Sequence, residues 1–158
     1  MNGSKYYQIQ DLFPHLKNPH KYVGTRPITM RSGWEIKFAS GFLDLNPSVV
    51  EWSSESVVIQ YFYPVDKKWH RYFTDFWMKV RQDDGTFKEF IIEIKPSAQT
   101  RPPKEPKRKT KGYINQVQTF IKNEAKWNTA RAYCADRTRM GRPTDFMIIT
   151  EHDIPGVK

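Results

Sequence analysis

The alternation of apolar and polar residues along the chain predicts four strands. The clearest runs from Glu89 to Lys95, and its centre, Phe90 to Ile94, is mostly β-branched and apolar, which is typical of a buried strand. The run Val57 to Tyr63 has the same character. We expect the other two strands at Trp69 to Val80 and at Phe146 to Thr150.

Two further segments have helical periodicity. The first extends from Ser32 to about Leu45, where Asn46-Pro47 ends it, and Ser32 and Glu35 have the spacing of a capping box. The second extends from about Thr110 to Ala135. Large apolar side chains recur near helical spacing along it and are expected to face the core: Tyr113, Val117, Phe120, Trp127 and Cys134.

These elements predict an α/β domain in the order helix, strand, strand, strand, helix, strand. A length of 158 residues fits one domain with a real core. We expect an irregular N-terminal arm at residues 1–31, a core domain at 32–150 and a loose tail at 151–158. The arm is polar and basic, and Pro14, Pro19, Gly24 and Pro27 interrupt it.

The strand at 89–95 carries two charges among apolar residues, Glu93 and Lys95. Their two-residue spacing places both side chains on one face. Upstream, Asp83-Asp84-Gly85 reads as a hairpin turn in which Gly85 supplies positive φ. Pairing across that turn would bring Asp75, on the preceding strand, to the same end of the hairpin as Glu93. The pattern therefore predicts a cluster of two carboxylates and one ammonium.

Such a cluster suits phosphodiester cleavage. Hard carboxylate oxygens hold Mg²⁺, which neutralises phosphate charge and activates water, and a lysine can orient the nucleophile. The plain alternative is a cross-strand ion pair between Glu93 and Lys95 on a solvated face. Two more residues are candidates from the helices. Glu35 is either a local helix cap or a third acidic group, and Gln116 either reaches the site or is simply exposed.

The charge distribution indicates a polyanionic partner. The formal net charge is +9 and the pI is near 9.6, so DNA or RNA is the first candidate. The Pro-rich loop 96–111 contains six basic residues against one acidic, a net of +5. It reads as an arm that grips phosphates, with a solvated, partly disordered loop as the alternative. Its basic residues are Arg101, Lys104, Lys107, Arg108, Lys109 and Lys111.

Several classes of protein are disfavoured. No apolar run approaches the ~18 residues of a membrane-spanning helix, no basic amphipathic helix stands out, and the N-terminus lacks a signal segment, so we expect a soluble protein made in the cytoplasm. A single cysteine, Cys134, excludes an internal disulfide and a cysteine-rich zinc site.

The order of elements and these residues resemble the PD-(D/E)xK nuclease superfamily of restriction enzymes and TnsA-type transposon endonucleases. The resemblance implies a restriction-endonuclease-like core, a mixed sheet flanked by helices. It maps the acidic helix residue to Glu35, the metal aspartate to Asp75, the E-x-K motif to Glu93 and Lys95, and the helix glutamine of some branches to Gln116. The motif that names the superfamily has a proline directly before the aspartate, and this sequence has Thr74 there. That position orients the aspartate and takes no part in the chemistry.

Six longer sequence segments resemble the head completion nucleases of T-even-like tailed phages. They are Asn-Pro-His-Lys-Tyr-Val-Gly (18–24), Arg-Ser-Gly-Trp-Glu (31–35), Lys-Trp-His-Arg-Tyr-Phe-Thr-Asp-Phe (68–76), Glu-Ile-Lys-Pro-Ser-Ala-Gln-Thr (93–100), Lys-Gly-Tyr-Ile-Asn-Gln-Val (111–117) and Ala-Lys-Trp (125–127). The resemblance implies trimming of packaged DNA before tail attachment, with portal or head and neck proteins as partners. It places the protein in the host cytoplasm during assembly, or in the virion.

The sequence thus predicts an endonuclease dependent on Mg²⁺, with Mn²⁺ as an alternative ion. Asp75 and Glu93 would bind the metal, with the Ile94 carbonyl as a further ligand. Glu35 would hold a second ion or a water on the first, and Lys95 would stabilise the attacking water. Two rivals remain: a non-catalytic structural or DNA-binding protein of the virion head or neck, and a junction or transposon-end nuclease.

Overall fold

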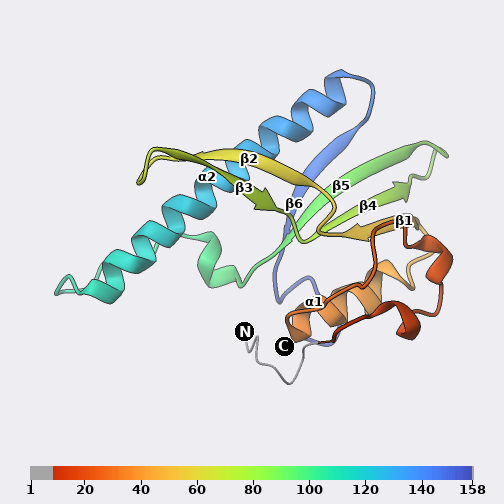
Figure 1. Ribbon diagram of the computed structural model, residues 1–158, viewed down its shortest axis with the longest axis horizontal. Coiled ribbons are helices and arrows are strands. Elements are labelled where there is room, and N and C mark those ends of the chain that lie inside the picture. Colours follow the sequence, from red (N-terminus) through yellow and green to blue (C-terminus); the bar gives the residue numbers. More distant parts are fainter. Residues whose placement is uncertain (1–8, 158) are drawn as a thin grey trace.

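The computed structural model describes residues 9–157 and shows an α/β fold built on a mixed four-stranded sheet (Figure 1). Residues 1–8 of the expected arm and residue 158 of the expected tail lie outside the described residues. In chain order the main elements are α1 (Gly33–Phe38), a π-helical turn (Ala39–Leu43), β1 (Val49–Ser54), β2 (Val58–Tyr63), β3 (Lys68–Phe73), β4 (Phe76–Arg81), β5 (Phe87–Ile94), a short 3-10 helix (Ser97–Thr100), α2 (Lys111–Arg139) and β6 (Thr144–Ile149).

The sheet has the strand order β1-β4-β5-β6, and β2 and β3 form a separate two-stranded ribbon. Within the sheet only β5 and β6 are parallel, and the 29-residue helix α2 supplies the crossover that a parallel pair requires. The hairpin between β4 and β5 is confirmed: Arg81 pairs with Phe87, and Gly85 has a φ of 87°.

The observed order of elements differs from the prediction in two places. Residues 49–54 form a strand, β1, which the sequence pattern did not single out. The run expected as one strand at 69–80 is two strands, β3 and β4, which belong to different sheets. Five strands therefore stand between α1 and α2 where three were expected, while the α/β class with a mixed sheet is confirmed.

The break between β3 and β4 falls at Thr74 and Asp75, and hydrogen bonds explain it. The amide and hydroxyl of Thr74 donate to the carbonyl of Val57 at 3.1 and 2.9 Å, on the ribbon side. The next amide, that of Asp75, donates to the carbonyl of Ile92 in the sheet at 3.1 Å. Consecutive residues thus bond to different layers, so the chain crosses from the ribbon to the sheet here.

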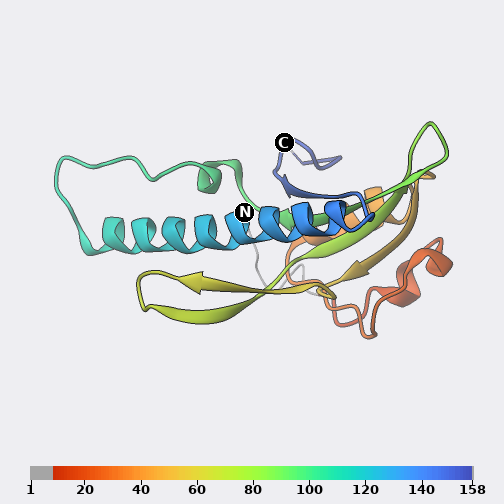
Figure 2. The ribbon, with the colours of Figure 1, turned by 90° about the horizontal axis from the view of Figure 1, so that it is seen from above.

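Two apolar cores cover the two faces of the sheet. Even-numbered residues of β5 face α1 and the N-terminal segment, and odd-numbered residues face α2 and the ribbon, as the two-residue period of a strand requires. The first core includes Leu12, Ile28, Met30, Trp52, Phe76 and Ile92. The second includes Ile59, Tyr61, Tyr72, Ile91, Trp127 and Cys134. Views along two directions show the first half of α2 between the ribbon and the 96–110 segment (Figures 1 and 2).

The segment before α1 has only short 3-10 turns but is tied to the core. The buried ammonium of Lys21 donates to the carbonyls of Leu43, Asp44 and Asn46, which end the first helical segment. The carboxylate of Asp44 in turn accepts from the amides of Lys17 and Asn18 at 2.7 and 2.9 Å. After β6, Ile154 is also buried in the first core.

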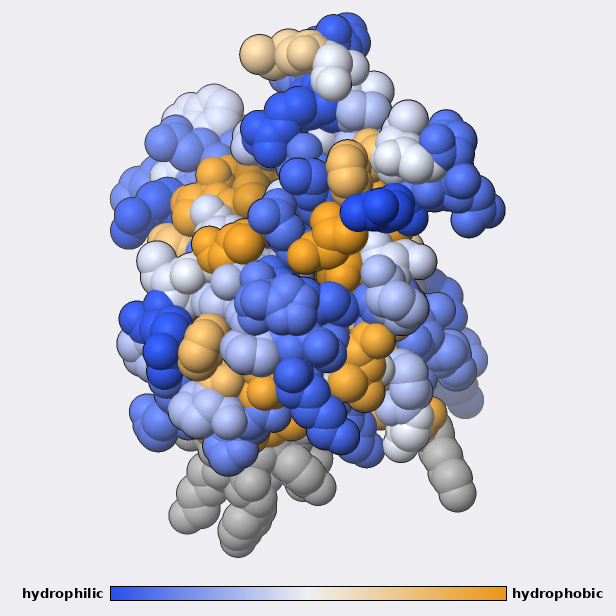
Figure 3. Space-filling model, turned by 90° about the vertical axis from the view of Figure 1, so that its right-hand side faces the viewer, coloured by the Kyte–Doolittle hydropathy of each residue, from blue (hydrophilic) through white to orange (hydrophobic). Residues whose placement is uncertain are grey.

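The face of the molecule on the side of the β4–β5 turn, the right-hand side of Figure 1, is mainly hydrophilic. Its apolar side chains form small separate groups (Figure 3). Among the described residues no helix is both long and apolar enough to cross a membrane.

Candidate active site

Asp75 and Glu93 meet at the point where β3 and β4 separate. Asp75 precedes β4, and its Oδ2 accepts a 2.7 Å hydrogen bond from the amide of Ile94. Glu93, on β5, is 6% exposed and faces the second core. The crossing at Thr74 therefore fixes the Asp75 carboxylate against the strand that carries Glu93.

The two carboxyl groups act on each other electrostatically. Burial, and then the negative charge of Glu93, raise the pKa of Asp75 well above its usual range; the amide of Ile94 opposes this in part. The charge of Glu35 raises it a little further. The site therefore concentrates negative charge in a partly desolvated place, which favours either a proton or a cation between the carboxylates.

Tyr72 is a site residue to which no motif in the sequence pointed. Its hydroxyl donates a 2.6 Å hydrogen bond to Oε1 of Glu93, and both side chains are buried. Burial, and then the charge of Glu93, raise the pKa of Tyr72 far above its ordinary value, so the phenol stays a donor. Only the break after β3, which brings the ribbon against β5, creates this contact.

Besides the expected Lys95, a second lysine, Lys126, belongs to the neighbourhood of the carboxylates. Lys95 is half-buried and follows β5, and its amide donates to the carbonyl of Ile149 at 2.9 Å. On α2, burial lowers the pKa of Lys126; the charge of Glu93 opposes this, and the charge of Lys95 adds to it. The ammonium of Lys126 also lies 5.3 Å from the ring centre of Tyr72. No motif in the sequence pointed to Lys126, because its position depends on where α2 crosses the sheet.

Glu35 serves α1 directly and the acidic pair only at a distance. Its amide donates to the hydroxyl of Ser32, and the hydroxyl of Ser32 donates back to Oε2 of Glu35, at 3.2 and 3.3 Å. Ser32 therefore caps α1, as the spacing predicts, but Glu35 returns the contact to the hydroxyl of Ser32 and not to its backbone amide as in a full capping box. Burial raises the pKa of Glu35, and the nearby charge of Glu55 adds to that effect.

The acidic side chains of this site fit a divalent cation that is held by two carboxylates and not by three. Within residues 9–157 no three His, Cys, Asp or Glu side chains converge closely enough to form a metal site by themselves, so Glu35 does not complete a three-carboxylate cage. Asp75 and Glu93 provide two crowded carboxylates. Mg²⁺ commonly binds through one or two carboxylates and keeps waters and substrate oxygens for its other positions.

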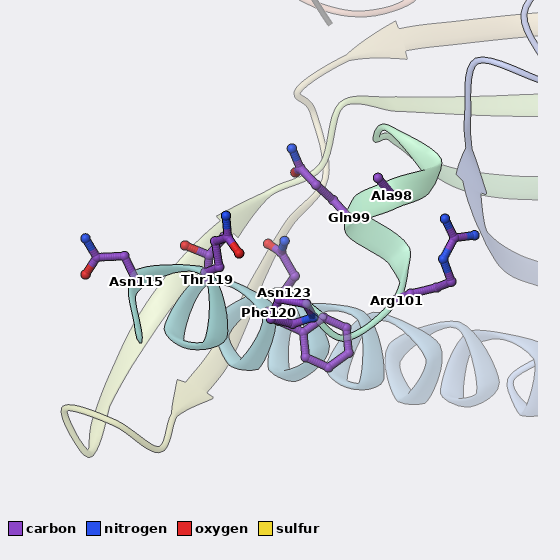
Figure 4. Close-up of a pocket in the computed structure, with 9 residues that line it drawn as sticks. Ala98, Gln99, Arg101, Asn115, Thr119, Phe120 and Asn123 are labelled. Carbon is purple, nitrogen blue, oxygen red and sulfur yellow. The ribbon is translucent and has the colours of Figure 1, made fainter. Parts of the chain in front are cut away.

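The structure does not bring Gln116 to the acidic pair. Gln116 is exposed and lies ten residues before Lys126 on α2, about 15 Å along the helix axis at the usual rise. It lines a cavity of about 440 Å³ between α2 and the segment that follows β5 (Figure 4).

The six basic residues of the 96–111 loop are all exposed. Residues 101–110 form no helix or strand. The one ion pair formed by these six residues within the described chain joins Lys109 to Glu105 at 3.8 Å, on the loop itself. Arg101 also lines the cavity that contains Gln116. The loop therefore offers free positive charge on the side of the molecule to which β5 leads.

Another glutamate on the same face of β5 has a different environment. Glu89 accepts hydrogen bonds from the indole of Trp77, from Arg137 and twice from Arg142, at 2.8 to 3.1 Å. Its carboxylate is fully partnered by protein groups, whereas Asp75 and Glu93 face each other. The structure thus separates a structural carboxylate from the candidate catalytic pair.

Comparison with known proteins agrees with this architecture. The mixed sheet with flanking helices is consistent with a restriction-endonuclease-like fold, and the chain belongs to the TnsA-like endonuclease N-terminal family, whose profile matches residues 46–151. The matched range contains Asp75, Glu93 and Lys95, while Glu35 precedes it.

One curated relative is the head completion nuclease of Enterobacteria phage T4. The two sequences are 41% identical over 140 residues, which cover 85% of this chain and 87% of the phage T4 protein. No solved structure matches the chain at a significant level.

Proposed function

We propose that this chain is a metal-dependent DNA endonuclease that hydrolyses phosphodiester bonds. One observation carries the proposal: the crowded Asp75–Glu93 pair lies near Lys126, and Lys95 follows Glu93 by two residues, in a chain of an endonuclease family. A cross-strand ion pair between Glu93 and Lys95 would not account for the carboxylate–carboxylate contact.

Asp75 and Glu93 would hold Mg²⁺, or Mn²⁺ in its place, with the Ile94 carbonyl as a further ligand. Glu35 would act through its charge, or on a second ion. When bound, the metal supplies neutralisation of phosphate charge and a lower pKa of water. Tyr72 keeps one oxygen of Glu93 in place, so that the other oxygen remains free for the cation.

The two lysines supply positive charge where negative charge grows during the reaction. Lys95 would orient the attacking water and stabilise the phosphate oxygens as they become more negative. Lys126 would contribute a second ammonium from the opposite wall. The basic loop, from Arg101 to Lys111, would grip the DNA backbone, because guanidinium and ammonium groups bind phosphates without reading sequence.

The similarity to the phage T4 protein supports a biological setting. We infer that the chain acts in completion of a phage head and trims packaged DNA before the tail attaches. Its partners would be DNA and proteins of the portal, head or neck, and its place would be the host cytoplasm during assembly or the virion. Residues 32–150 would form the nuclease domain.

A plasmid cleavage assay tests the enzyme and its site together. Supercoiled plasmid, linear duplex and a duplex with a single-stranded end are incubated with Mg²⁺ or EDTA and with the wild type, Lys95→Ala or Lys88→Ala. Lys88 is a matched control at the opposite end of β5, where it pairs with Asp145. We expect cleavage that requires Mg²⁺, falls at least about 100-fold in Lys95→Ala and is unchanged in Lys88→Ala.

DNA binding by gel shift completes the test. Lys95→Ala should still bind DNA in a salt-dependent manner. If the wild type bound DNA but cut none of the three substrates, the nuclease assignment would be wrong and a structural DNA-binding role would replace it.

A further inference from the structure

A cavity with several polar side chains in its lining lies next to the candidate active site, and the nuclease mechanism does not use it. Its volume is about 440 Å³, within the range of ~300–1,000 Å³ of ligand pockets. One wall is the first half of α2 and the other is the segment that follows β5 (Figure 4). The chemistry of its lining is unusual: four side-chain amides, an aromatic ring and a guanidinium, from Gln99, Asn115, Gln116, Asn123, Phe120 and Arg101.

Asn123 indicates that the cavity is built for a ligand. It is 4% exposed, it lines the cavity, and its side-chain amide has no hydrogen-bond partner within residues 9–157. Figure 4 shows this amide pointing from α2 toward the helical turn that carries Gln99. The amide atoms of Asn123 are not among the fully buried polar atoms without a partner, so they open onto the cavity, where a molecule that offers both a donor and an acceptor could bond to them.

The cavity is adjacent to the acidic pair along both of its walls. Asn123 precedes Lys126 by three residues on α2, so the two side chains are neighbours, about 5–6 Å apart. The opposite wall begins at Ala98, three residues after Lys95. A DNA strand whose phosphate lies between Asp75, Glu93 and Lys95 would therefore pass the mouth of the cavity with its next nucleotide.

We propose that this cavity binds one unpaired nucleobase of the DNA substrate, directly beside the phosphate that is cut; this rests on the proposed nuclease function. Amides present a donor and an acceptor side by side, as the edge of a base does. The ring of Phe120 offers a stacking surface, and Arg101 offers a cation to the attached phosphate.

Neutral amides inside a basic surround distinguish a base from other ligands. A phosphate alone would leave the amide oxygens facing negative charge, and an apolar ligand would leave the amides of Asn123 and Gln116 unsatisfied. A base inside a duplex already uses its pairing edge. The cavity thus selects DNA with a single-stranded end or an everted base at the cleavage point.

Binding is measured first, without cleavage, so that it does not depend on activity. The Lys95→Ala protein is titrated in EDTA against a duplex with a short single-stranded extension in which one unpaired position carries 2-aminopurine. Extensions at 3′ and 5′ ends are tested separately, along with the same probe fully paired and with free deoxynucleotides as competitors.

We expect a fluorescence change with at least one of the two extensions and none with the paired probe. Adding Asn123→Leu to the Lys95→Ala protein should weaken binding of the extended probe at least about tenfold, since a stacked, hydrogen-bonded base contributes that much to the affinity. Gln118→Ala, an exposed glutamine on α2 outside the cavity, is the matched control and should bind like its parent. Thermal unfolding of each variant verifies that it folds, and Gln99→Ala, in the opposite wall, gives a second variant should Asn123→Leu unfold.

Cleavage then separates this inference from the proposed function. The active protein should cut the extended duplex at least about tenfold faster than a blunt duplex, and an abasic position beside the cut should remove the difference. Metal-dependent cleavage at equal rates on blunt, extended and abasic substrates would overturn the base-binding cavity and leave the nuclease intact. Displacement of the probe by an equal concentration of free deoxynucleotide would also overturn it, in favour of a small-molecule site.

Discussion

Tyr72 donates a 2.6 Å hydrogen bond to Glu93 from a ribbon that is not part of the sheet to which Glu93 belongs. The contact fixes one oxygen of a buried carboxylate whose neighbour, Asp75, carries the same charge. Two separate layers of the fold therefore define the orientation of a single side chain.

Tyr72→Phe should weaken metal binding more than folding. Without the hydroxyl, Glu93 loses its fixed orientation, and partners of this kind contribute about 10–100-fold in metal affinity. We expect the Mg²⁺ concentration for half-maximal cleavage to rise by about that factor, with a smaller change at saturating Mg²⁺. Tyr61→Phe is the control, because Tyr61 is equally buried in the ribbon and its hydroxyl forms no hydrogen bond to residues 9–157. Equal effects of the two substitutions would contradict a positioning role for Tyr72.

Asp75→Asn should stabilise the metal-free protein while it abolishes cleavage. The substitution removes one of two crowded, partly desolvated charges, and active-site charge of this kind costs stability. We expect Tm at pH 7 without metal to rise by about 2–4 °C, the equivalent of roughly 1 kcal/mol for a chain of this size.

Metal should stabilise the wild type but not Asp75→Asn. Mg²⁺ at about 100 times its Kd should stabilise the wild type by about 2.7 kcal/mol and so raise its Tm. The Tm of Asp75→Asn should not change when Mg²⁺ is added. Asp83→Asn, in the exposed β4–β5 turn, is the control and should respond to Mg²⁺ like the wild type. A wild type whose Tm ignores Mg²⁺, Mn²⁺ and Ca²⁺ alike would exclude a metal site at this pair.

The basic loop should set the salt dependence of DNA binding. Each phosphate contact contributes a slope of about 0.9 to the plot of log K against log salt for duplex DNA. Replacing Lys107, Arg108 and Lys109 by glutamine should lower that slope by about 2–3 without changing sequence preference. Replacing Lys17 and Lys37, which are exposed near the N-terminal segment and α1, should change it by less than one. Binding that did not vary with salt would refute the loop's role.

The candidate site shows which features a sequence pattern can reveal. Glu93 and Lys95 stand out because charges interrupt a β-branched run, and Asp75 follows from the hairpin that Gly85 marks. The N-cap of α1 by Ser32 is also local, and the structure confirms it. In each case the decisive signal lies within a few residues.

The features that were missed depend on distant partners. Apolar residues continue on both sides of Thr74, so the pattern of 69–80 reads as one strand, and the break follows only from hydrogen bonds to Val57 and Ile92. Lys126 belongs to the site because α2 crosses the sheet at that turn, and Gln116 lies too far along the same helix. Periodicity identifies the face of a helix but not the position at which it meets a site.

Gly24→Ala should test whether close packing of the segment 18–24 contributes to the stability of the fold. A Cβ at Gly24 would lie 2.5 Å from the hydroxyl oxygen of Tyr22 and 2.9 Å from Cβ of Ser53, so the N-terminal segment must shift. We expect a loss of about 1–3 kcal/mol in urea denaturation, as for other overpacked sites. Gly41→Ala is the control, because nothing lies within 4 Å of its Cβ position, and it should be neutral or slightly stabilising. Equal stabilities of the two variants would show that the segment is not closely packed there.

Glu89→Gln should damage stability rather than chemistry. Burial alone raises the pKa of Glu89, but hydrogen bonds from Arg142 and Trp77 outweigh it and hold the pKa below its ordinary value of 4.5. The folded state therefore binds fewer protons than the unfolded state between the two pKa values. The stability from this carboxylate is fully present above pH 4.5 and is lost as the pH falls through the folded pKa.

Loss of the charge should cost about 2 kcal/mol at pH 7, because the guanidinium of Arg137 is left without its charged partner. Urea denaturation at pH 7 and pH 3 measures this, and the difference between wild type and Glu89→Gln should shrink at the lower pH. Asp145→Asn, whose ion pair with Lys88 is largely exposed, should change stability by less than about 1 kcal/mol at either pH. At 25 °C Glu89→Gln should still cut DNA with Mg²⁺; a loss as large as that of Asp75→Asn would mean that Glu89 contributes to the active site.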